Sequence, residues 1–334
     1  MSQTIRLKKG FSINLAGKPE KQVLEIKQPE TFAVKPSDFL GLSRPKLTVK
    51  EGDNVKAGTP LFFERGIEDI LFTAPVSGEV IEIKRGEKRK VLEVKILADK
   101  EVEFEKFNKY SISDISSIDK EEALLQLKKS GAWTNFIQRP FGIIANPEES
   151  PKAIFISGFD THPLAPDFVH LLQGQDQNFQ AGIDILKKFT SGTIHLNIDG
   201  NGEIPQVFSQ ANGVQLNKIY GLHPAGNVGV QIHHLAPISK GDVVWTLNPV
   251  GIAQVGKLFL DGVYDTSRLV AVTGSQIKKT GYVKTYAGAC LNKLLEANVE
   301  GNDNRFISGN VLTGEGVGPE GYLGYYHNQI SVIP

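Results

Sequence analysis

Short apolar segments, interrupted at close intervals by glycine and proline, constrain the fold of the first hundred residues. Residues 49–61 and 72–81 each hold at least two Gly or Pro residues among Val, Leu, Ile and Phe. Apolar runs broken in this way predict short strands joined by tight turns, and they exclude long helices. The sequence therefore predicts a compact all-β unit, to which we assign residues 31–103.

The two halves of this unit carry the patterns EGD-x-V-x-x-G-x-P-L (residues 51–61) and A-P-x-S-G-x-V (residues 74–80). This pair resembles the barrel-sandwich fold of biotinyl and lipoyl carrier domains. Carrier domains present a lysine on the hairpin between the halves, but residues 65–69 here contain none. The resemblance implies that the fold is kept without the swinging-arm chemistry.

The middle of the chain alternates between helical and strand-like patterns. Asp119 and Glu122 form a potential capping box before an apolar stripe that stops at Gly131. Strand-like residues 153–157 and 193–198 then flank a helical pattern over 179–188. Strand, helix and strand in this order predict a parallel sheet, and we expect a Rossmann-like α/β domain over residues 104–250.

The last third predicts a second mixed unit. Residues 258–262 and 268–272 have the composition of a hairpin, residues 287–297 that of a helix, and residues 305–308 that of a strand. This order predicts a β-grasp (SLBB-like) domain over residues 251–334. Residues 1–30 are expected to form an N-terminal extension that packs on the α/β domain. The predicted fold class is therefore multidomain α/β.

Composition excludes several functions. Lys plus Arg and Asp plus Glu number 37 each, so no net charge attracts nucleic acid. Cys290 is the single cysteine, whereas an iron–sulfur cluster takes four thiolates. No stretch approaches the roughly 18 apolar residues of a membrane span, and no secretory h-region follows Lys8 and Lys9. We expect a protein that stays inside the cell and reaches a membrane only by docking.

Two glycine- or histidine-rich motifs have plain structural interpretations. Residues 313–318 offer glycines for a phosphate, but they run into Pro319 and so favour a loop over a dinucleotide-binding turn. His233 and His234 would point to opposite faces of a strand, which argues against a shared metal ion. The loop of His223, Pro224 and Gly226 is either a ligand or interface loop or a structural turn.

Many stretches, in order along the chain, resemble the NqrA family, the soluble component of the sodium-translocating NADH:quinone oxidoreductases. They include residues 5–11 (IRLKKGF), 41–45 (GLSRP), 139–141 (RPF), 223–226 (HPAG), 256–260 (GKLFL), 308–314 (SGNVLTG) and 322–327 (YLGYYH). The family is related to the C subunit of the Rnf complexes and to the flavin-carrying subunit of respiratory complex I. Those relatives bind flavin through a glycine-rich stretch, which is SGAWTNF (residues 130–136) here.

The resemblance implies a soluble subunit of a complex that couples NADH oxidation and quinone reduction to Na⁺ export. It implies no tightly bound cofactor on this chain, neither flavin nor iron–sulfur, and a quinone (ubiquinone or menaquinone) as substrate. The expected partners are the integral membrane subunits, at the cytoplasmic face, and the isolated chain is expected to be inactive. Family members continue beyond the position of Pro334 into a more helical region, so we expect a shortened form.

The resemblance also implies quinone contacts in two segments, residues 35–42 and 133–141. Flat aromatic faces and a guanidinium suit a quinone ring and its carbonyl oxygens, although core packing is the alternative for at least two of the aromatics. Residues 37–39 depart from the more acidic, tyrosine-containing version of the family. The candidate contacts are Asp38, Phe39, Leu42, Arg44, Trp133, Phe136, Arg139 and Phe141.

Two other functions compete with this one. The chain could be a stand-alone ligand-binding β-grasp module that shares only a fold with the family. A Rossmann-type NADH enzyme is a third possibility, which the missing fingerprint disfavours.

Overall fold

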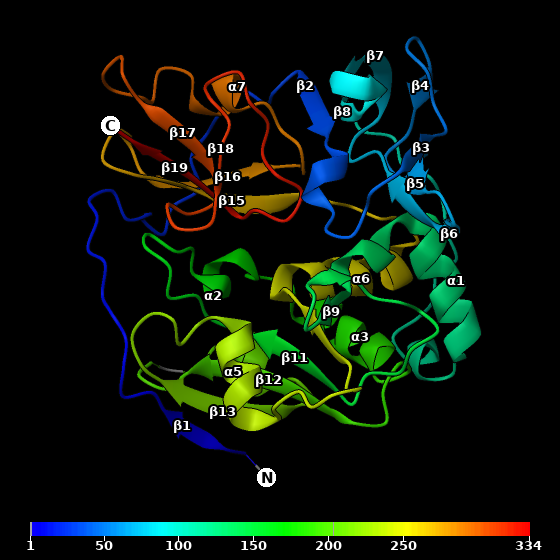
Figure 1. Cartoon of the computed structure of the whole chain (residues 1–334), viewed down its shortest axis with the longest axis vertical. Helices are drawn as coiled ribbons and strands as arrows, with labels where there is room; N and C mark the ends of the chain where they lie inside the picture. Colours follow the sequence, from blue (N-terminus) through cyan, green and yellow to red (C-terminus); the bar gives the residue numbers. More distant parts are fainter. Residues whose placement is uncertain (1, 203) are drawn as a thin grey trace.

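Four β-sheets divide the chain into three units, which Figure 1 shows as two smaller units above a larger one. The computed structural model describes residues 2–202 and 204–334. The barrel-sandwich unit comes first, the α/β unit second and the β-grasp unit last. Together they bring residues 40–42 and residues 143–144, which are far apart in the sequence, side by side. These two segments form part of the candidate site.

The barrel-sandwich unit consists of two antiparallel sheets that face each other. One has the order β2–β8–β7–β4 and the other β3–β5–β6. Gly78 is required at the start of β7, because a Cβ there would lie 2.0 Å from the carbonyl oxygen of Leu97. The elements are β2 (Thr31–Val34), η1 (Pro36–Asp38), β3 (Pro45–Leu47), β4 (Asn54–Val55), β5 (Pro60–Glu64), β6 (Ile67–Thr73), β7 (Gly78–Arg85), η2 (Glu87–Arg89) and β8 (Val91–Ala98).

The α/β unit is built on a sheet of order β1–β13–β12–β11–β14–β9–β10. Strands β11 to β14 are parallel, and β9 and β10 add an antiparallel edge. The chain moves outward from β11 to β13 and then returns to place β14 on the other side of β11. The strands are β1 (Thr4–Arg6), β9 (Ile137–Arg139), β10 (Ile143–Ile144), β11 (Ala153–Ser157), β12 (Thr193–Asp199), β13 (Gln215–Tyr220) and β14 (Val244–Leu247).

Helices cover both faces of this sheet. Phe155 and Val244 pack against α5 (Val228–Leu235), whereas Ile154 and Ile156 belong to the main core with α3 (Asp176–Leu186) and α6 (Pro249–Asp261). Helix α1 (Lys120–Ser130) starts as expected, with the Asp119 carboxylate accepting the Glu122 amide at 2.7 Å. Short helices complete the unit: η3 (Asp114–Ser116), η4 (Ala132–Asn135), α2 (Phe168–Leu171) and α4 (Gln206–Ser209).

The β-grasp unit has the sheet order β16–β15–β19–β17–β18 and one short helix. Its central pair, β15 and β19, is parallel, and the other pairs are antiparallel. The elements are β15 (Arg268–Thr273), β16 (Gly281–Thr285), α7 (Leu291–Leu295), β17 (Arg305–Ser308), β18 (Glu315–Gly316) and β19 (Gln329–Ile333). The helix is shorter than the expected range of 287–297.

The predicted hairpin of residues 258–262 and 268–272 is wrong. Residues 258–261 end α6, and β15 pairs with β16 instead. The missed signal is the helix start, where Asn248 accepts the Val250 amide at 2.9 Å and Pro249 occupies the first turn. Because α6 packs on α3, we place the end of the α/β unit after Asp261, beyond the expected boundary at 250.

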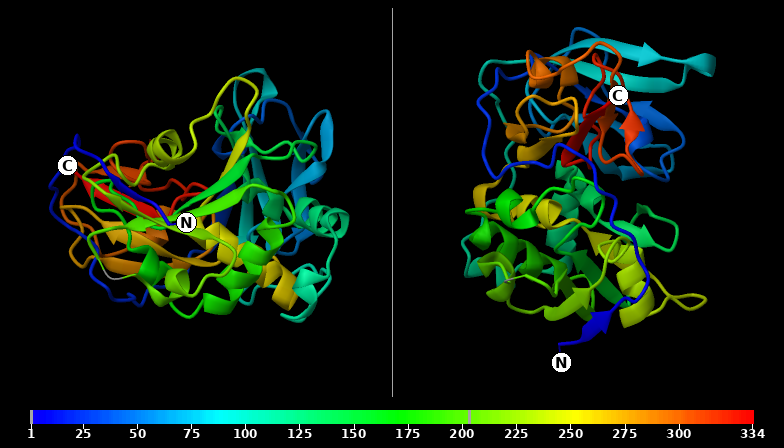
Figure 2. Two further views of the ribbon diagram at one scale, coloured as in Figure 1. Left: turned by 90° about the horizontal axis from the view of Figure 1, so that it is seen from below. Right: turned by 90° about the vertical axis from the view of Figure 1, so that its left-hand side faces the viewer.

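The N-terminal segment contacts two units. Strand β1 pairs in parallel with β13, and the following residues then run along the β-grasp unit, as Figure 2 shows. There the Leu24 amide donates to the carbonyl oxygen of Tyr282 at 2.7 Å. The segment therefore ties the α/β unit to the β-grasp unit rather than packing on the α/β unit alone.

Two helical glycines provide a test of the α3–α6 packing. A Cβ on Gly256 would lie 1.8 Å from the carbonyl oxygen of Asn178 in α3, so Gly256→Ala should destabilise the fold by about 2–3 kcal/mol through overpacking. Urea unfolding measures this loss. Gly229→Ala is the matched control, because α5 has open space there and alanine favours a helix by up to about 1 kcal/mol. Equal stabilities for the two variants would contradict this packing.

Candidate functional site

Side chains of the barrel-sandwich unit and of the β-grasp unit meet around Phe39. Its ring lies 4.6 Å from that of Phe72 and 4.7 Å from that of Tyr325, and it is 2% exposed. The Asp38 carboxylate accepts the Tyr325 amide at 2.9 Å and lies 3.4 Å from Lys35 Nζ. We call this set of contacts the joint. Two of the candidate quinone contacts, Asp38 and Phe39, therefore hold the units together, with Phe39 buried and the Asp38 side chain 10% exposed.

A tyrosine connects the joint to the α/β unit. The Tyr264 hydroxyl accepts from Asn135 Nδ2 at 2.9 Å and lies 3.1 Å from the Tyr325 hydroxyl. The Tyr326 hydroxyl donates to the carbonyl oxygen of Thr134 at 2.7 Å. Burial raises the pKa of Tyr264 and Tyr326 well above the ordinary value, so both stay neutral. The joint thus fixes η4 relative to the segment around Phe39.

Trp133 and Phe136 are core residues of the α/β unit. Their rings stack at 4.4 Å, and Trp245 closes the cluster at 5.5 Å from Trp133. Both side chains are fully buried, and Trp133 Nε1 donates to the carbonyl oxygen of Ala145 at 2.8 Å. Because neither side chain is exposed, neither can contact a ligand in this conformation. They position the β9–β10 hairpin, which follows them in the chain.

The two segments expected to contact quinone meet beside this cluster. The Ile144 amide donates to the carbonyl oxygen of Leu40 at 3.4 Å. A Cβ on Gly41 would lie 3.1 Å from Ile143 Cβ, and its φ of +91° favours glycine. The loop after η1 therefore lies directly against the β9–β10 hairpin.

A groove of about 650 Å³ opens at this meeting point, between the β5–β6 hairpin and β10. Its surface is largely apolar, and four carboxylates also line it. We call this cavity the groove. The apolar side chains are Leu40, Leu42, Ile67, Ile70, Phe72, Ile143 and Ile144, and the acidic ones are Glu64, Glu68, Asp69 and Glu148.

Of the candidate contacts, Leu42 lines the groove, and Phe141 and Arg44 lie outside its lining. Phe141, at the turn of the β9–β10 hairpin, is 79% exposed. Arg44 is exposed, and its amide donates to the Glu64 carboxylate at 2.9 Å. Arg139 faces a different cavity, described next. The sequence interpretation missed Ile67, Ile70 and Ile143, although Ile67 in a hairpin of otherwise polar residues was a visible signal.

A second cavity, of about 620 Å³, lies where the strand order of the parallel sheet reverses. Open α/β sheets bind ligands at this position, beyond the carboxyl ends of the strands. Ser157 ends β11, Leu247 ends β14, and the first turns of α5 and α6 face the space between them. We call this cavity the crevice.

Arg139 supplies the crevice with a cation. Burial lowers the pKa of its guanidinium, and its Nε has no acceptor among the described residues. Asp160 and His162 also line the crevice and pair with each other. The strand β11 is followed by Gly158, Phe159 and Asp160, so a glycine-rich dinucleotide turn is missing at this position.

The loop from His223 to Gly226 packs against the rim of the crevice. His223 Nδ1 lies 3.2 Å from Thr161 Oγ1, and that same oxygen accepts the Gly226 amide at 3.0 Å. A Cβ on Gly226 would lie 2.6 Å from the Thr161 amide nitrogen. Pro224 comes before Gly226 in this loop and does not line the crevice. The loop therefore shapes the rim, and Gly226 is its residue that lines the crevice.

The strand assignment of His233 and His234 is wrong, because both lie in the last turn of α5. Among the described residues, no group of three His, Cys, Asp or Glu side chains is arranged to hold a metal ion. No helix in the described part of the chain has the length and apolarity needed to cross a bilayer.

Comparison with known proteins identifies the family. The sequence matches the NqrA N-terminal barrel-sandwich hybrid domain over residues 5–99, the NqrA second alpha/beta domain over residues 118–264, and the NQRA C-terminal domain over residues 269–318. The chain belongs to the NqrA family. This result confirms the resemblance found in the sequence and the predicted fold class of barrel-sandwich, α/β and β-grasp domains.

Curated members of the NqrA family align with almost the whole chain. The A subunit of the Na⁺-translocating NADH-quinone reductase of Marinomonas sp. is 37% identical over 329 residues, which cover 98% of this chain and 73% of that protein. The protein of the same name from Neisseria meningitidis serogroup A is 36% identical over 330 residues, with the same coverage. Identity at this level excludes the alternative of a module that shares only the fold.

Solved structures give a more distant likeness. An NAD⁺-reducing [NiFe]-hydrogenase in the H₂-reduced state aligns with 66% of this chain and 47% of its own, at 13% identity and a TM-score of 0.44.

The joint can be tested at Tyr264. Tyr264→Phe removes the hydroxyl between Asn135 and Tyr325 and leaves the buried Asn135 amide without this acceptor, so the free energy of unfolding should fall by about 1–2 kcal/mol. Tyr286→Phe is the control, because the half-buried Tyr286 hydroxyl makes no hydrogen bond within the described residues. Chemical denaturation compares them, and an unchanged Tyr264→Phe protein would contradict the role of the joint.

Two histidines, the buried His195 and the half-buried His327, should make the fold sensitive to mild acid. Burial lowers the pKa of His195 and of His327 to about 4, from 6.5 in the unfolded chain. The unfolded chain therefore binds more protons between pH 6.5 and 4, and stability falls as the pH drops through this window. Between pH 7.5 and 5.5 the loss should be about 1 kcal/mol per histidine.

His195→Gln tests this dependence, because it removes one of the two titrating rings. We expect urea unfolding of the variant to change less between pH 7.5 and 5.5 than that of the parent protein. Parallel curves for the two proteins would show that His195 is not held neutral by its burial.

Proposed function

We propose that this member of the NqrA family serves as the A subunit of a Na⁺-translocating NADH-quinone reductase and contributes a quinone site at the groove. The main support for this proposal is that residues 40–42 and 143–144, which lie about a hundred residues apart in the sequence, form one apolar wall of the groove. NADH oxidation and Na⁺ movement would belong to other subunits, with this chain docking on the membrane subunits.

The groove has the chemistry of a site for a quinone. Small-molecule sites are concave and mostly apolar, and their volumes are typically about 300–1,000 Å³. The volume of the groove, about 650 Å³, lies within this range. Leu40 and Ile67 are 62% and 49% exposed, so the apolar surface continues out of the groove. An isoprenoid tail would lie on this surface, because burial of its apolar area is favourable.

Polar groups for the quinone oxygens lie along the same wall. The Ser43 and Arg44 amides are already used by Glu64, at 2.9 Å each. The side chains of Asn146 and Arg44 are exposed near the groove, and the Asn146 amide group is a potential donor to a carbonyl oxygen. The crevice is the second candidate, favoured by its position at the strand-order reversal and by Arg139 Nε, which has no acceptor in the part of the chain that the structure describes.

Paired apolar substitutions test the groove. Ile67→Asn should weaken binding of a short-chain ubiquinone to the purified chain by about tenfold, because a polar amide replaces an apolar wall. Ile81→Asn is the control, since Ile81 is similarly exposed, at 42%, but lies on β7 away from the groove. Calorimetric titration gives the dissociation constants.

Intrinsic fluorescence would not localise the ligand, because Trp133 and Trp245 lie in one buried cluster.

A second pair of variants tests whether the site extends to the turn of the β9–β10 hairpin. Phe141→Ser changes that turn, and Phe11→Ser is its control, since the two rings are similarly exposed, at 79% and 75%. Loss of binding in Phe141→Ser alone would extend the site to the hairpin turn. Equal binding by Ile67→Asn, Ile81→Asn and the parent protein would overturn the groove as the quinone site.

A further inference from the structure

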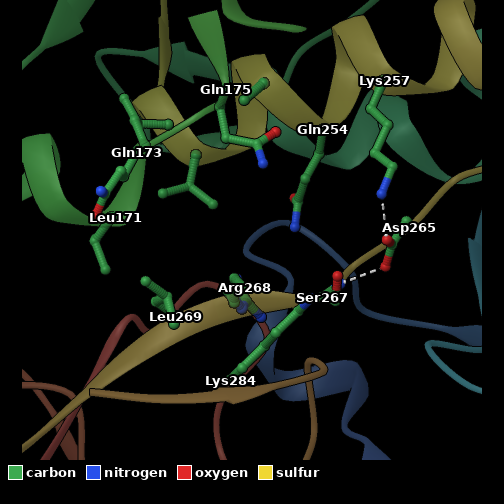
Figure 3. Close-up of a pocket in the computed structure, with 13 residues that line it drawn as sticks. Leu171, Gln173, Gln175, Gln254, Lys257, Asp265, Ser267, Arg268, Leu269 and Lys284 are labelled. Carbon is green, nitrogen blue, oxygen red and sulfur yellow. Dashed lines mark hydrogen bonds and ion pairs between the residues drawn. The ribbon is translucent and has the colours of Figure 1, made fainter. Parts of the chain in front are cut away.

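A third cavity lies between the α/β unit and the β-grasp unit and shares no lining residue with the groove or the crevice. Its volume is about 260 Å³. Figure 3 shows helix α6 on one side and strand β15 on the other, with Gln173 and Gln175 of the α2–α3 loop beside them. We call it the inter-unit cavity.

Gln254 is a buried donor without an acceptor in this cavity. The residue is 8% exposed, and its Nε2 has no hydrogen-bond partner among the described residues. Figure 3 shows its side chain extending from α6 toward β15. Leaving a buried amide N–H unpaired costs about 1–3 kcal/mol. An acceptor inside the cavity would satisfy this donor.

The neighbouring carboxylate is already engaged and does not supply this acceptor. Asp265 Oδ2 lies 2.7 Å from Lys257 Nζ, and Asp265 Oδ1 accepts the Ser267 amide at 2.8 Å. Burial opposes ionisation, but these contacts outweigh it and hold the pKa of Asp265 below its usual value. Asp265 thus stays charged and bound to Lys257.

Positive charge is in excess around the cavity. Its lining holds three cations, Lys257, Arg268 and Lys284, and one carboxylate, Asp265. Arg268 donates to the carbonyl oxygen of Tyr325, and its Nε has no acceptor among the described residues. Unpaired donors and uncompensated cations both favour a ligand that is anionic and rich in acceptor oxygens.

We propose that the inter-unit cavity binds a small oxyanion, carrying carboxylate or phosphate groups, that accepts from Gln254 and pairs with Lys284. The volume corresponds to about nine water molecules, at about 30 Å³ each, which suits inorganic phosphate or a four-carbon dicarboxylate. Gln254 lies on α6 and Lys284 on β16, so the bound anion links the α/β unit to the β-grasp unit.

Calorimetric titration of the intact chain with sodium phosphate and with sodium succinate, at constant ionic strength, tests this site. We expect saturable binding of one anion per chain for at least one of the two probes. Binding of succinate alone identifies a carboxylate site, and binding of phosphate alone a phosphate site. Neither probe saturating would overturn the proposal.

Two variants locate the bound anion. Gln254→Leu keeps the size of the side chain and removes the donor, and it should weaken binding at least tenfold. Lys284→Met should weaken binding about threefold or more. Lys240→Met changes another exposed lysine, outside the cavity, and should bind as the parent does. If Gln254→Leu fails to fold, the comparison of Lys284→Met with Lys240→Met shows whether the anion binds in this cavity. Unchanged affinity in Gln254→Leu or in Lys284→Met would show that the anion does not bind here.

Discussion

The joint around Phe39 is the contact on which the arrangement of the three units depends. Phe39 comes from the barrel-sandwich unit, Tyr325 from the β-grasp unit, and Tyr264 from the connection between the α/β and β-grasp units. Aromatic packing supplies the apolar burial, and the hydroxyl and carboxylate contacts fix the geometry. Because the joint holds Phe39 in place, the next residues, 40–42, are held against β10. The groove is a direct consequence of this joint.

This arrangement separates two kinds of side chain that the sequence presents together. Phe39, Trp133 and Phe136 are enclosed and act as supports, whereas Leu42 and Phe141, a few residues away, face the groove or the solvent. The apolar groove lies between the barrel-sandwich and α/β units, the crevice lies at the strand-order reversal within the α/β unit, and the inter-unit cavity lies between the α/β and β-grasp units. The three cavities therefore differ in the side chains that line them.

Short sequence patterns predicted those helices and strands whose ends are set by neighbouring residues. The Asp119 cap, the Gly131 stop and strands β11 and β12 follow from short-range propensities and were found in the sequence. Residues 258–261 were misassigned because an apolar run fits a strand and a buried helix alike, and length decides between them only when the Asn248–Pro249 start is recognised. The sequence shows Ile67 as an apolar residue in a polar hairpin, but local patterns do not show that the chain brings it to the same cavity as Ile143.

Mapping the attachment site of a photoreactive short-chain ubiquinone on the purified chain tests the central claim most directly. Peptide mass spectrometry after illumination reports which residues the ring and tail touch. The account predicts labels within residues 40–42, 66–70 and 143–148, suppressed by excess unlabelled quinone. Labels confined to the crevice, at residues 157–162 and 226–230, would contradict the groove and assign the quinone to the strand-order reversal of the α/β unit.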